Sequence, residues 1–540
     1  MLARVGMFTR TALRMRPSMA IARLRGTQRV SERTFAGERT FKLPRIAIAS
    51  IDLDSDYLSR FDADALFEGE FLLLNERHQV DTSIWKAPEA SHLWNFNLHY
   101  FEWGIVLAAR WKETGESRWI EGFKNLVLSW VSACSYPKGD AWHPYTISLR
   151  LTNWLICIDL FDGLLEHDGG FFSTMHESMY RQYRHLLANQ EAHLRANHWW
   201  ENLKTLAIMS AAFGEHGAHT KVMRRLEGQL EEQILPDGVH FERSLMYHKL
   251  VLEGMLRIWV ASERVGFLLP GCFAPKVKLM LDAMASLERG MGKTPFFNDS
   301  ADGVAKECGA LVAACKLLLD MEADNSKTTF PNAGYYKLYD GDIAVMFDVG
   351  EPGPSYMLGH AHCDCLSFEL SYKGKPVIVN SGTYAYQSKL RPYFRSTAAH
   401  NTCMTNGEEQ LECWGEHRIG RGYRDPMIEE ISDKHLIGAM TLPSGKRLQR
   451  SIVLSGGSRV FVEDFVDRAE GAKIESFVHV APRSSVILEA AKGSLKETES
   501  DYSPEFGLLE TSRTFSIEAV GRASYSLRIV GEKGGARCEG

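Results

Sequence analysis

The chain has 540 residues, of which 45% are hydrophobic, 24% charged and 11% aromatic. This length predicts two or three domains, and the composition is typical of a globular protein and excludes collagen-like, coiled-coil and largely disordered chains. The 62 Lys and Arg residues against 68 Asp and Glu residues give a net charge of −6, so no overall basic field exists for nucleic acid or an anionic membrane surface.

The N-terminal segment differs in composition from the rest of the chain. Residues 1–31 contain seven arginines and no acidic residue, and the arginines interrupt every apolar stretch, so a secretory hydrophobic segment is not recognisable. We predict a disordered basic tail over residues 1–45, although an organelle-targeting leader or a translational-start artefact would have a similar composition. Charged residues also interrupt the apolar stretch 250–270, so the sequence predicts no transmembrane segment. The ten cysteines form no paired C-x-x-C motifs and do not indicate a disulfide framework.

Residues 46–325 are predicted to form a helical domain. Apolar residues recur at helical spacing, for example over residues 119–131 and 249–265. Short breaks that contain glycine or proline, such as residues 136–139 and 236–238, separate these segments at intervals that suit stacked helical hairpins.

From residue 326 to residue 540 the apolar period changes to two. Apolar and polar residues alternate over 366–372, and a Lys-Gly-Lys turn at 373–375 leads into the apolar segment 376–379. This pattern is typical of a β-hairpin, and it recurs over residues 451–466. The sequence therefore predicts an antiparallel sheet domain after the helical one, which makes the chain an α+β two-domain protein.

The segment Asn-His-Trp-Trp-Glu-Asn at residues 197–202 places an amide, an imidazole, two indoles and a carboxylate at the predicted start of a helix. One interpretation is structural: Asn197 caps the helix, and His198 and the tryptophans pack. The functional interpretation is that amide and imidazole donors face an acidic sugar while an indole forms a stacking surface. The sequence leaves both interpretations open.

Residues 237–248 alternate ionisable and apolar residues where a loop enters a helix. Tyr247 follows Arg243 by one helical turn, and a nearby cation would lower the pKa of the phenol towards that of a usable base. The alternative is a solvated loop with a packed Tyr247.

Histidines mark the start of the sheet domain. His360 and His362 are separated by one residue on a predicted strand, which points both imidazoles to one face, as two metal ligands or as one ligand and one catalytic group. His400 is a third, separated donor that could close a zinc site. The Cys-Asp-Cys segment at 363–365 offers competing ligands, although the alternative for its cysteines is a buried position on the opposite strand face.

Five segments occur in a specific order: Asn-His at 197–198, residues 237–248, Gly-His-Ala-His-Cys-Asp at 359–364, Val-Asn-Ser-Gly-Thr-Tyr at 379–384 and Arg-Ser-Thr-Ala-Ala-His-Asn-Thr at 395–402. Together they resemble the heparinase II/III-like polysaccharide lyases in order and approximate spacing, and five motifs in order are far more specific than any one of them. The resemblance implies an incomplete (α/α) toroid followed by an antiparallel β-sandwich, with a sugar chain bound in the cleft between the two.

The implied reaction is β-elimination at a uronic acid, in which the C5 proton is removed and the 4-linked sugar leaves. Because this proton lies beside a carboxylate, donors must neutralise that group and stabilise the enolate-like state. The resemblance implies that Asn197 and His198 neutralise the carboxylate and that Tyr247 is the base. His360 matches a further catalytic histidine, placed to help neutralise the carboxylate or to protonate the departing oxygen.

The resemblance also implies a zinc ion. His362 and His400 match histidines that hold zinc in several relatives, where the third ligand is an aspartate at the position of Asn380. An amide oxygen carries no charge and is a poorer zinc ligand than a carboxylate, so this position departs from the family pattern. A bound ion would brace the wall that carries His360 instead of activating water.

Further cleft residues follow from the same resemblance. Tyr386 or Tyr393 is a candidate for the second tyrosine that protonates the leaving oxygen in some relatives. Arg150 and Arg243 could pair with carboxylates or sulfates, with internal salt bridges as the alternative. Six aromatic residues suit stacking on sugar rings, with packing between helices as the alternative for most of them: Trp94, Tyr100, Trp103, Trp142, Trp199 and Trp200.

Two rival functions stay open. A glycoside hydrolase on the same scaffold would use two carboxylates around a water, such as Glu201 with Glu242 or Asp299 with Asp302. A non-catalytic glycan-binding or assembly protein would keep the cleft without the chemistry. The expected partner is an acidic polysaccharide, and the sequence gives no indication of oligomeric state. The resemblance implies the cell envelope or periplasm, and the absence of a clear export signal leaves the cytoplasm as the alternative.

Overall fold

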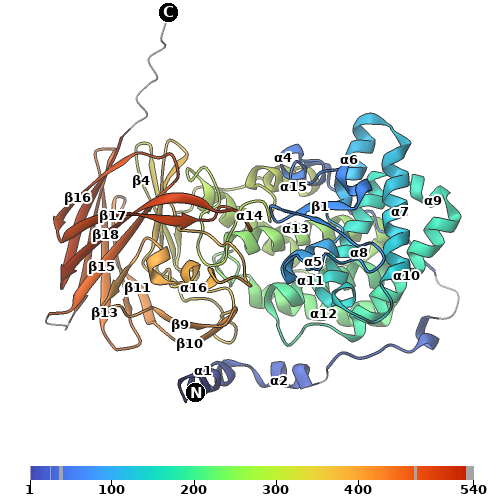
Figure 1. Cartoon of the computed structure of the whole chain (residues 1–540), viewed down its shortest axis with the longest axis horizontal. Helices are drawn as coiled ribbons and strands as arrows, with labels where there is room; N and C mark the ends of the chain where they lie inside the picture. Colours follow the sequence, from blue (N-terminus) through green and yellow to red (C-terminus); the bar gives the residue numbers. More distant parts are fainter. Residues whose placement is uncertain (1, 25, 36–39, 468–470, 531–540) are drawn as a thin grey trace, which may run out of the picture.

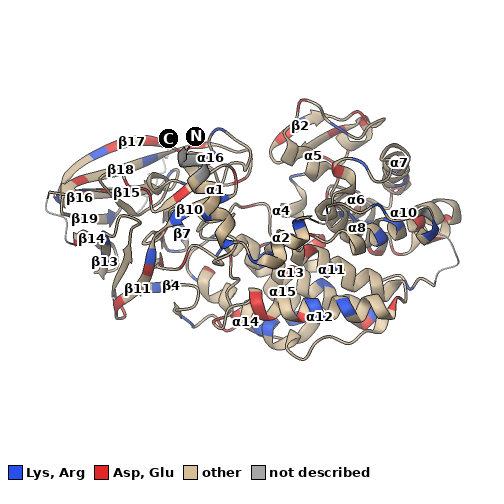
Figure 2. Ribbon diagram, turned by 90° about the horizontal axis from the view of Figure 1, so that it is seen from below, with Lys and Arg blue, Asp and Glu red and all other residues tan. Residues whose placement is uncertain are grey.

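The computed structural model describes residues 2–24, 26–35, 40–467 and 471–530. Helices come first and strands follow, with the change between Leu319 and Thr329. Figure 1 shows the helical and the sheet domain side by side along the long axis of the molecule. The predicted α+β architecture, a helical toroid followed by antiparallel sheets, is confirmed. Acidic and basic residues are interspersed along both domains (Figure 2).

The helical domain has two layers. Fourteen of the seventeen residues of α11 are buried, against six of the eighteen residues of α12, because α11 lies in the inner layer with α8 and α13 while α12 lies outside. Among the described residues, no helix is both long enough and apolar enough to cross a membrane. The helices of the chain up to the sheet domain are α1 (Leu2–Arg14), α2 (Pro17–Leu24), α3 (Ala49–Asp52), α4 (Ser55–Leu58), α5 (His92–Leu98), α6 (Gly104–Thr114), α7 (Ser117–Ala133), α8 (Pro144–Leu160), α9 (Leu164–His167), α10 (Gly169–Ala188), α11 (Ala196–Ala212), α12 (His216–Gln233), α13 (Leu245–Ala261), α14 (Phe273–Glu288) and α15 (Cys308–Leu319), and the hairpin of β1 (Glu70–Leu73) and β2 (Glu76–Gln79) lies between α4 and α5.

The sheet domain contains two large antiparallel sheets whose inner faces form its core. Burial alternates along β13 and β14, so that one face of each strand packs inward and the other faces solvent. The first sheet has the order β11 (Arg424–Ile431), β12 (His435–Thr441), β13 (Arg447–Ser455), β14 (Arg459–Asp467), β19 (Arg522–Ile529) and β16 (Val486–Lys492). The second has the order β17 (Ser494–Tyr502), β18 (Glu510–Val520), β15 (Lys473–Val480), β7 (Lys375–Ile378), β6 (Phe368–Tyr372), β5 (Ile343–Asp348), β4 (Tyr335–Asp340) and β3 (Thr329–Phe330), and β8 (Cys403–Thr405) also pairs with β15. A short helix, α16 (Arg391–Phe394), and a hairpin of β9 (Leu411–Trp414) and β10 (Arg418–Gly422) lie on the side that faces the helical domain.

The N-terminal segment differs from the prediction of a disordered tail, because most of its first 24 residues form α1 and α2. Arg10 Nη2 lies 2.6 Å from Glu412 Oε1 on β9, and Arg16 Nη1 lies 2.6 Å from Glu232 Oε1 on α12. The arginines of the segment thus find their acidic partners on both domains, which composition alone could not indicate. In Figure 1 this N-terminal arm runs along one side of the two domains.

Candidate active site

A cleft of about 430 Å³ opens where the helical domain meets the sheet domain. The first turns of α11 and α13 form one wall, and loops at 357–360, 386–387 and 416–417 form the other. Tyr386 lines the cleft, whereas the Tyr393 hydroxyl lies elsewhere, 3.4 Å from the carbonyl oxygen of Asp501. The cleft brings together all four residues that the sequence analysis proposed for catalysis: Asn197, His198, Tyr247 and His360.

Two consecutive left-handed residues lead the chain into Asn197. Arg195 has φ 54° and Ala196 has φ 46°, which residues other than glycine rarely adopt. Such conformations persist where contacts hold them, and Arg195 donates to Glu232 at 2.7 Å. The Asn197 amide nitrogen donates to Tyr145 Oη at 3.0 Å, and its oxygen has no hydrogen-bond partner within the described residues. One amide hydrogen and the amide oxygen therefore remain for a ligand in the cleft.

His198 is held by a buried carboxylate that the sequence analysis did not identify. Its Nδ1 lies 2.9 Å from Glu191 Oε1, and Asn202 donates to the other Glu191 oxygen at 3.1 Å. Burial would lower the pKa of His198, but nearby carboxylates, Glu191 foremost, together outweigh burial and raise this pKa. The half-buried imidazole therefore stays charged to a higher pH than a free histidine would, and its Nε2–H remains for a ligand.

Tyr247 forms a pair with Tyr386, and their hydroxyl oxygens are 2.7 Å apart. The prediction that Arg243 lowers the pKa of Tyr247 is wrong, because the Arg243 guanidinium donates to the carbonyl oxygens of Asn332 and Ala333, at 3.1 and 2.9 Å. Burial, together with the neighbouring Tyr386, instead raises the pKa of Tyr247 well above its usual value. The phenol is therefore neutral in the free protein.

His360 is oriented by Asp299, a fully buried carboxylate that also receives the guanidinium of Arg391. His360 Nδ1 lies 2.9 Å from Asp299 Oδ2. Burial would raise the pKa of Asp299, but Arg391 and two histidine hydrogen bonds hold it well below its usual value. An ionised carboxylate only accepts hydrogen bonds, so His360 carries its hydrogen on Nδ1 when neutral and leaves the Nε2 lone pair free. The His360 ring packs against Tyr247 with ring centres 4.5 Å apart.

Glu242 lies among these residues, with Oε1 3.8 Å from His360 Nε2. Its Oε2 has no hydrogen-bond partner within the described part of the chain, and burial raises its pKa. The carboxylates considered for a hydrolase are not free pairs. Glu201 forms an ion pair with Lys204, and Asp299 is held by Arg391.

His362 and His400 form a buried pair, with His362 Nδ1 3.1 Å from His400 Nε2. The outer nitrogen of His400 lies 2.8 Å from the carbonyl oxygen of Ser396, and that of His362 lies 2.8 Å from Asp299 Oδ1, so both outer nitrogens donate and both facing nitrogens carry lone pairs. Burial lowers the pKa of each histidine to about 4, which disfavours a proton between them. Two imidazole nitrogens on one tetrahedral zinc ion lie about 3.3 Å apart, so this pair fits a metal ion.

The third predicted ligand, Asn380, has an amide that is already engaged. Its oxygen accepts from Ser367 Oγ at 2.7 Å and from the Asn401 backbone nitrogen at 3.0 Å, and its nitrogen donates to the carbonyl oxygen of Phe296 at 3.0 Å. Metal ligation by Asn380 would require the loss of hydrogen bonds, and it stays a prediction.

A different group of potential ligands lies closer to the cleft. One ligand atom from each of Asp299, His360 and His417 lies within 4.8 Å of the others. Arg391 already neutralises Asp299, and its positive charge would repel a divalent cation at short range. The same guanidinium lies 3.5 Å from His362 Nε2, so its charge disfavours a metal ion at both places, and the geometry allows one at either.

Two family models match nearly the whole chain. The model described as "Heparinase II/III N-terminus" matches residues 36–320, and the model described as "Heparinase II/III-like, C-terminal" matches residues 323–527. The chain belongs to the heparinase II/III family. The matches end close to the boundary between helices and strands at residues 319–329.

Curated relatives of this family chain include two proteins named heparin-sulfate lyase. The one from Pedobacter heparinus is 21% identical over 368 residues, covering 62% of this chain and 54% of the relative. The one from Bacteroides thetaiotaomicron is 21% identical over 406 residues, covering 65% of this chain and 58% of the relative. The alignments thus span little more than half the length of these relatives.

Solved structures share the family fold. A crystal structure of heparinase III superposes with a TM-score of 0.69 at 15% identity, covering 92% of this chain and 88% of that chain. A mutant heparan sulfate lyase from Pedobacter heparinus gives a TM-score of 0.58 at 17% identity, covering 95% and 88%.

The remaining predicted cleft residues of this heparinase II/III chain are mostly structural. Of the six aromatic residues, Tyr100 lines the cleft, whereas Trp94, Trp103, Trp142 and Trp200 are buried in the helical core, and Trp199 packs at its edge. Arg150 is fully buried and donates to the carbonyl oxygens of His99 and Ala141. Both arginines proposed to bind the substrate therefore serve the fold instead, although their partners are carbonyl groups and not acids.

Proposed function

We propose that this chain is a polysaccharide lyase that cleaves a uronate-containing glycosaminoglycan by β-elimination. The observation that carries the proposal is the tyrosine pair Tyr247–Tyr386, whose hydroxyl oxygens are 2.7 Å apart in the cleft that Asn197, His198 and His360 also line. The heparin-sulfate lyases among its relatives support this substrate class.

His198 and Asn197 would neutralise the substrate carboxylate. The Glu191 carboxylate keeps His198 charged, and the Asn197 amide retains one hydrogen to donate. Together they would stabilise the dianionic state that forms when the C5 proton leaves. One preorganised donor of this kind contributes about 10²- to 10³-fold to kcat.

The tyrosine pair would move the proton without a free phenolate. As Tyr247 Oη takes the C5 proton, its own proton passes to Tyr386 Oη, and the Tyr386 proton passes to the departing O4 of the sugar. The C5–H and C4–O4 bonds break, the C4–C5 double bond and the O4–H bond form, and both tyrosines end neutral. This relay fits the raised pKa of Tyr247, because no step needs a stable phenolate.

His360 would hold the relay in place. Its ring packs on Tyr247, and its hydrogen bond to Asp299 leaves Nε2 to face the substrate. Glu242 lies 3.8 Å from that nitrogen, and burial raises its pKa, which would weaken its repulsion of the substrate carboxylate.

We also propose that His362 and His400 hold a zinc ion, with Asn380 as a candidate third ligand. The ion would supply a positive charge that joins the His362 segment to the segment before β8 and so braces the wall that carries His360. The support is that His362 Nδ1 and His400 Nε2 lie 3.1 Å apart in a fully buried position, with their lone pairs facing each other.

The test is a screen of the purified protein against a panel of uronate polymers. Each reaction is followed by the ultraviolet absorbance of the unsaturated product and by the number of new reducing ends. A lyase gives one unsaturated end for each new reducing end. New reducing ends without absorbance would indicate a hydrolase and refute the proposal, and so would binding without either product.

A further inference from the structure

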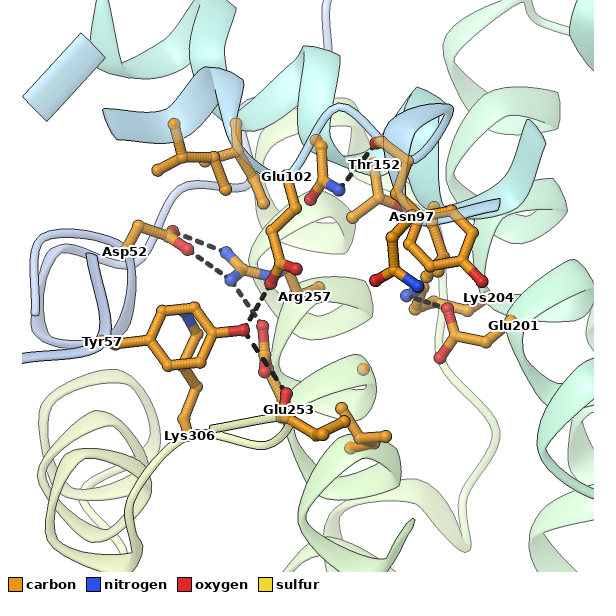
Figure 3. A pocket seen from close by; sticks show the side chains of 18 of the residues that line it. Asp52, Tyr57, Asn97, Glu102, Thr152, Glu201, Lys204, Glu253, Arg257 and Lys306 are labelled. Carbon is orange, nitrogen blue, oxygen red and sulfur yellow. Dashed lines mark hydrogen bonds and ion pairs between the residues drawn. The ribbon is translucent and has the colours of Figure 1, made fainter. Parts of the chain in front are cut away.

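A second cavity of about 150 Å³ continues inward from the cleft into the helical domain (Figure 3). The two spaces share a rim, so a ligand in the cleft can reach into the inner cavity. Six residues line both spaces: Leu74, Asn97, Tyr100, Tyr145, Leu250 and Val304. Tyr145 also accepts the hydrogen bond from Asn197, which places the entrance beside the proposed catalytic residues.

The charges on the walls of the inner cavity balance. Figure 3 shows Arg257 with its carboxylate partner Asp52 on one side and Lys204 with Glu201 on the other. Four acidic and four basic side chains line the space: Asp52, Glu102, Glu201, Glu253, Arg60, Lys204, Arg257 and Lys306. An anionic uronate or sulfate would gain no net attraction here and would lose its hydration, so the lining favours an uncharged ligand.

Several polar atoms of the lining lack partners. Lys306 is 4% exposed and makes no hydrogen bond or ion pair among the described residues; its ammonium lies over the Tyr57 ring, 3.0 Å from the centre. Burial lowers its pKa to about 8, so it is still mostly charged at neutral pH. The Tyr100 hydroxyl and one oxygen each of Glu201 and Glu253 also have no partner in the described chain. Both donors and acceptors without partners thus line the space, and hydroxyl groups can satisfy both kinds.

A buried ion pair forms the inner end of the cavity. The Asp52–Arg257 pair forms this end, and Asp52 is completely buried while Arg257 is 2% exposed. Arg257 also donates to the carbonyl oxygen of Ile46, at 3.0 Å, which fixes it in place. Elsewhere in the lining, the side chains of Arg60 and Glu102 are each 29% exposed, so the cavity is not sealed from solvent.

Resting on the proposed lyase function, we propose that the inner cavity is a subsite for one uncharged, hydroxyl-rich sugar ring of the substrate. The Lys306 ammonium and the Tyr100 hydroxyl donate to the ring, and the carboxylates of Glu201 and Glu253 accept from its hydroxyl groups.

The experiment compares wild type with Lys306→Met and Tyr100→Phe on a polymer that wild type cleaves. The control is Lys316→Met, which removes an exposed lysine of α15 that pairs with Asp320. The control should keep the wild-type KM for a short oligosaccharide. KM for a short oligosaccharide with a neutral terminal sugar should rise about 10- to 100-fold in Lys306→Met and about 3- to 10-fold in Tyr100→Phe, with a much smaller change in kcat.

An unchanged KM in Tyr100→Phe would overturn the subsite; this second variant keeps the test valid if Lys306→Met fails to fold. If no polymer yields unsaturated ends, the lyase function itself fails. Titration calorimetry with methyl glucoside then still tests the subsite: heat of binding in wild type that Lys306→Met lacks supports it. No heat in wild type, or equal heat with glycerol, contradicts a sugar site.

Discussion

Glu191→Gln tests whether a buried carboxylate keeps His198 charged. The substitution retains the shape of the side chain and its capacity to accept from His198, but it removes the negative charge 2.9 Å from the imidazole. A hydrogen bond to a charged partner contributes about 1.5–3 kcal/mol and a neutral one about 0.5–1.5 kcal/mol. The charged form of His198 should therefore lose about 1–2 kcal/mol of stabilisation. Because the ring is half-exposed, we expect the lower part of this range.

The expected pH dependence of activity follows from the direction in which the pKa of His198 is shifted. Because Glu191 raises the pKa of His198, activity that needs the imidazolium is present below that pKa and is lost as the pH rises through it. In Glu191→Gln this loss should begin at a lower pH, and kcat/KM on the alkaline side should fall about 5- to 10-fold relative to wild type.

The assay is the pH profile of kcat/KM, with thermal unfolding as a check on folding. Glu177→Gln, which removes an exposed acid of α10 beside Arg181, is the matched control and should keep the wild-type profile. A uniform loss of activity with an unshifted profile would refute the role of Glu191 in charging His198.

Three further outcomes are expected. Tyr386→Phe should lower kcat about 10²- to 10⁴-fold in initial-rate measurements with little change in KM, and a wild-type kcat would contradict the proton relay. Arg391→Met should destabilise the fold by about 3–5 kcal/mol in urea unfolding, because Asp299 stays buried without its partner. Adding Asp299→Asn should restore part of this lost stability. Strictly additive effects of the two substitutions would argue against the pairing. A chelator should lower both the thermal midpoint and the activity of wild type but not of His400→Ala, and an equal response of both proteins would exclude zinc at His400.

Much of the architecture could be predicted from the sequence because apolar residues recur clearly at helical spacing in the first domain and at every second residue in the other. Each pattern indicates which side of a single helix or strand is buried, as over residues 46–325 and 366–372. The boundary between the domains follows from the change from one pattern to the other. The N-terminal arm could not be predicted, since its helices depend on partners such as Glu232 and Glu412, which lie hundreds of residues away.

The candidate site divides in a similar way. The residues that face the cleft lie in recognisable motifs, whereas the residues that set their charge do not. Glu191 lies seven residues from His198, across the turn before α11, and Arg391 lies 92 residues from Asp299, so neither contact follows from a helical or strand spacing. The expected effect of Arg243 on Tyr247 failed because α13 begins only at Leu245: Arg243 lies before the helix with φ 53°, and its side chain points to the carbonyl oxygen of Ala333.

The most direct measurement compares turnover and polysaccharide binding in wild type and Tyr247→Phe, which lacks only the hydroxyl that pairs with Tyr386. On the most readily cleaved uronate polymer, wild type should form unsaturated ends, and the variant should bind the polymer with nearly unchanged affinity while forming essentially none. Unsaturated ends formed by the variant at a rate close to that of wild type would show that the C5 proton leaves by another route.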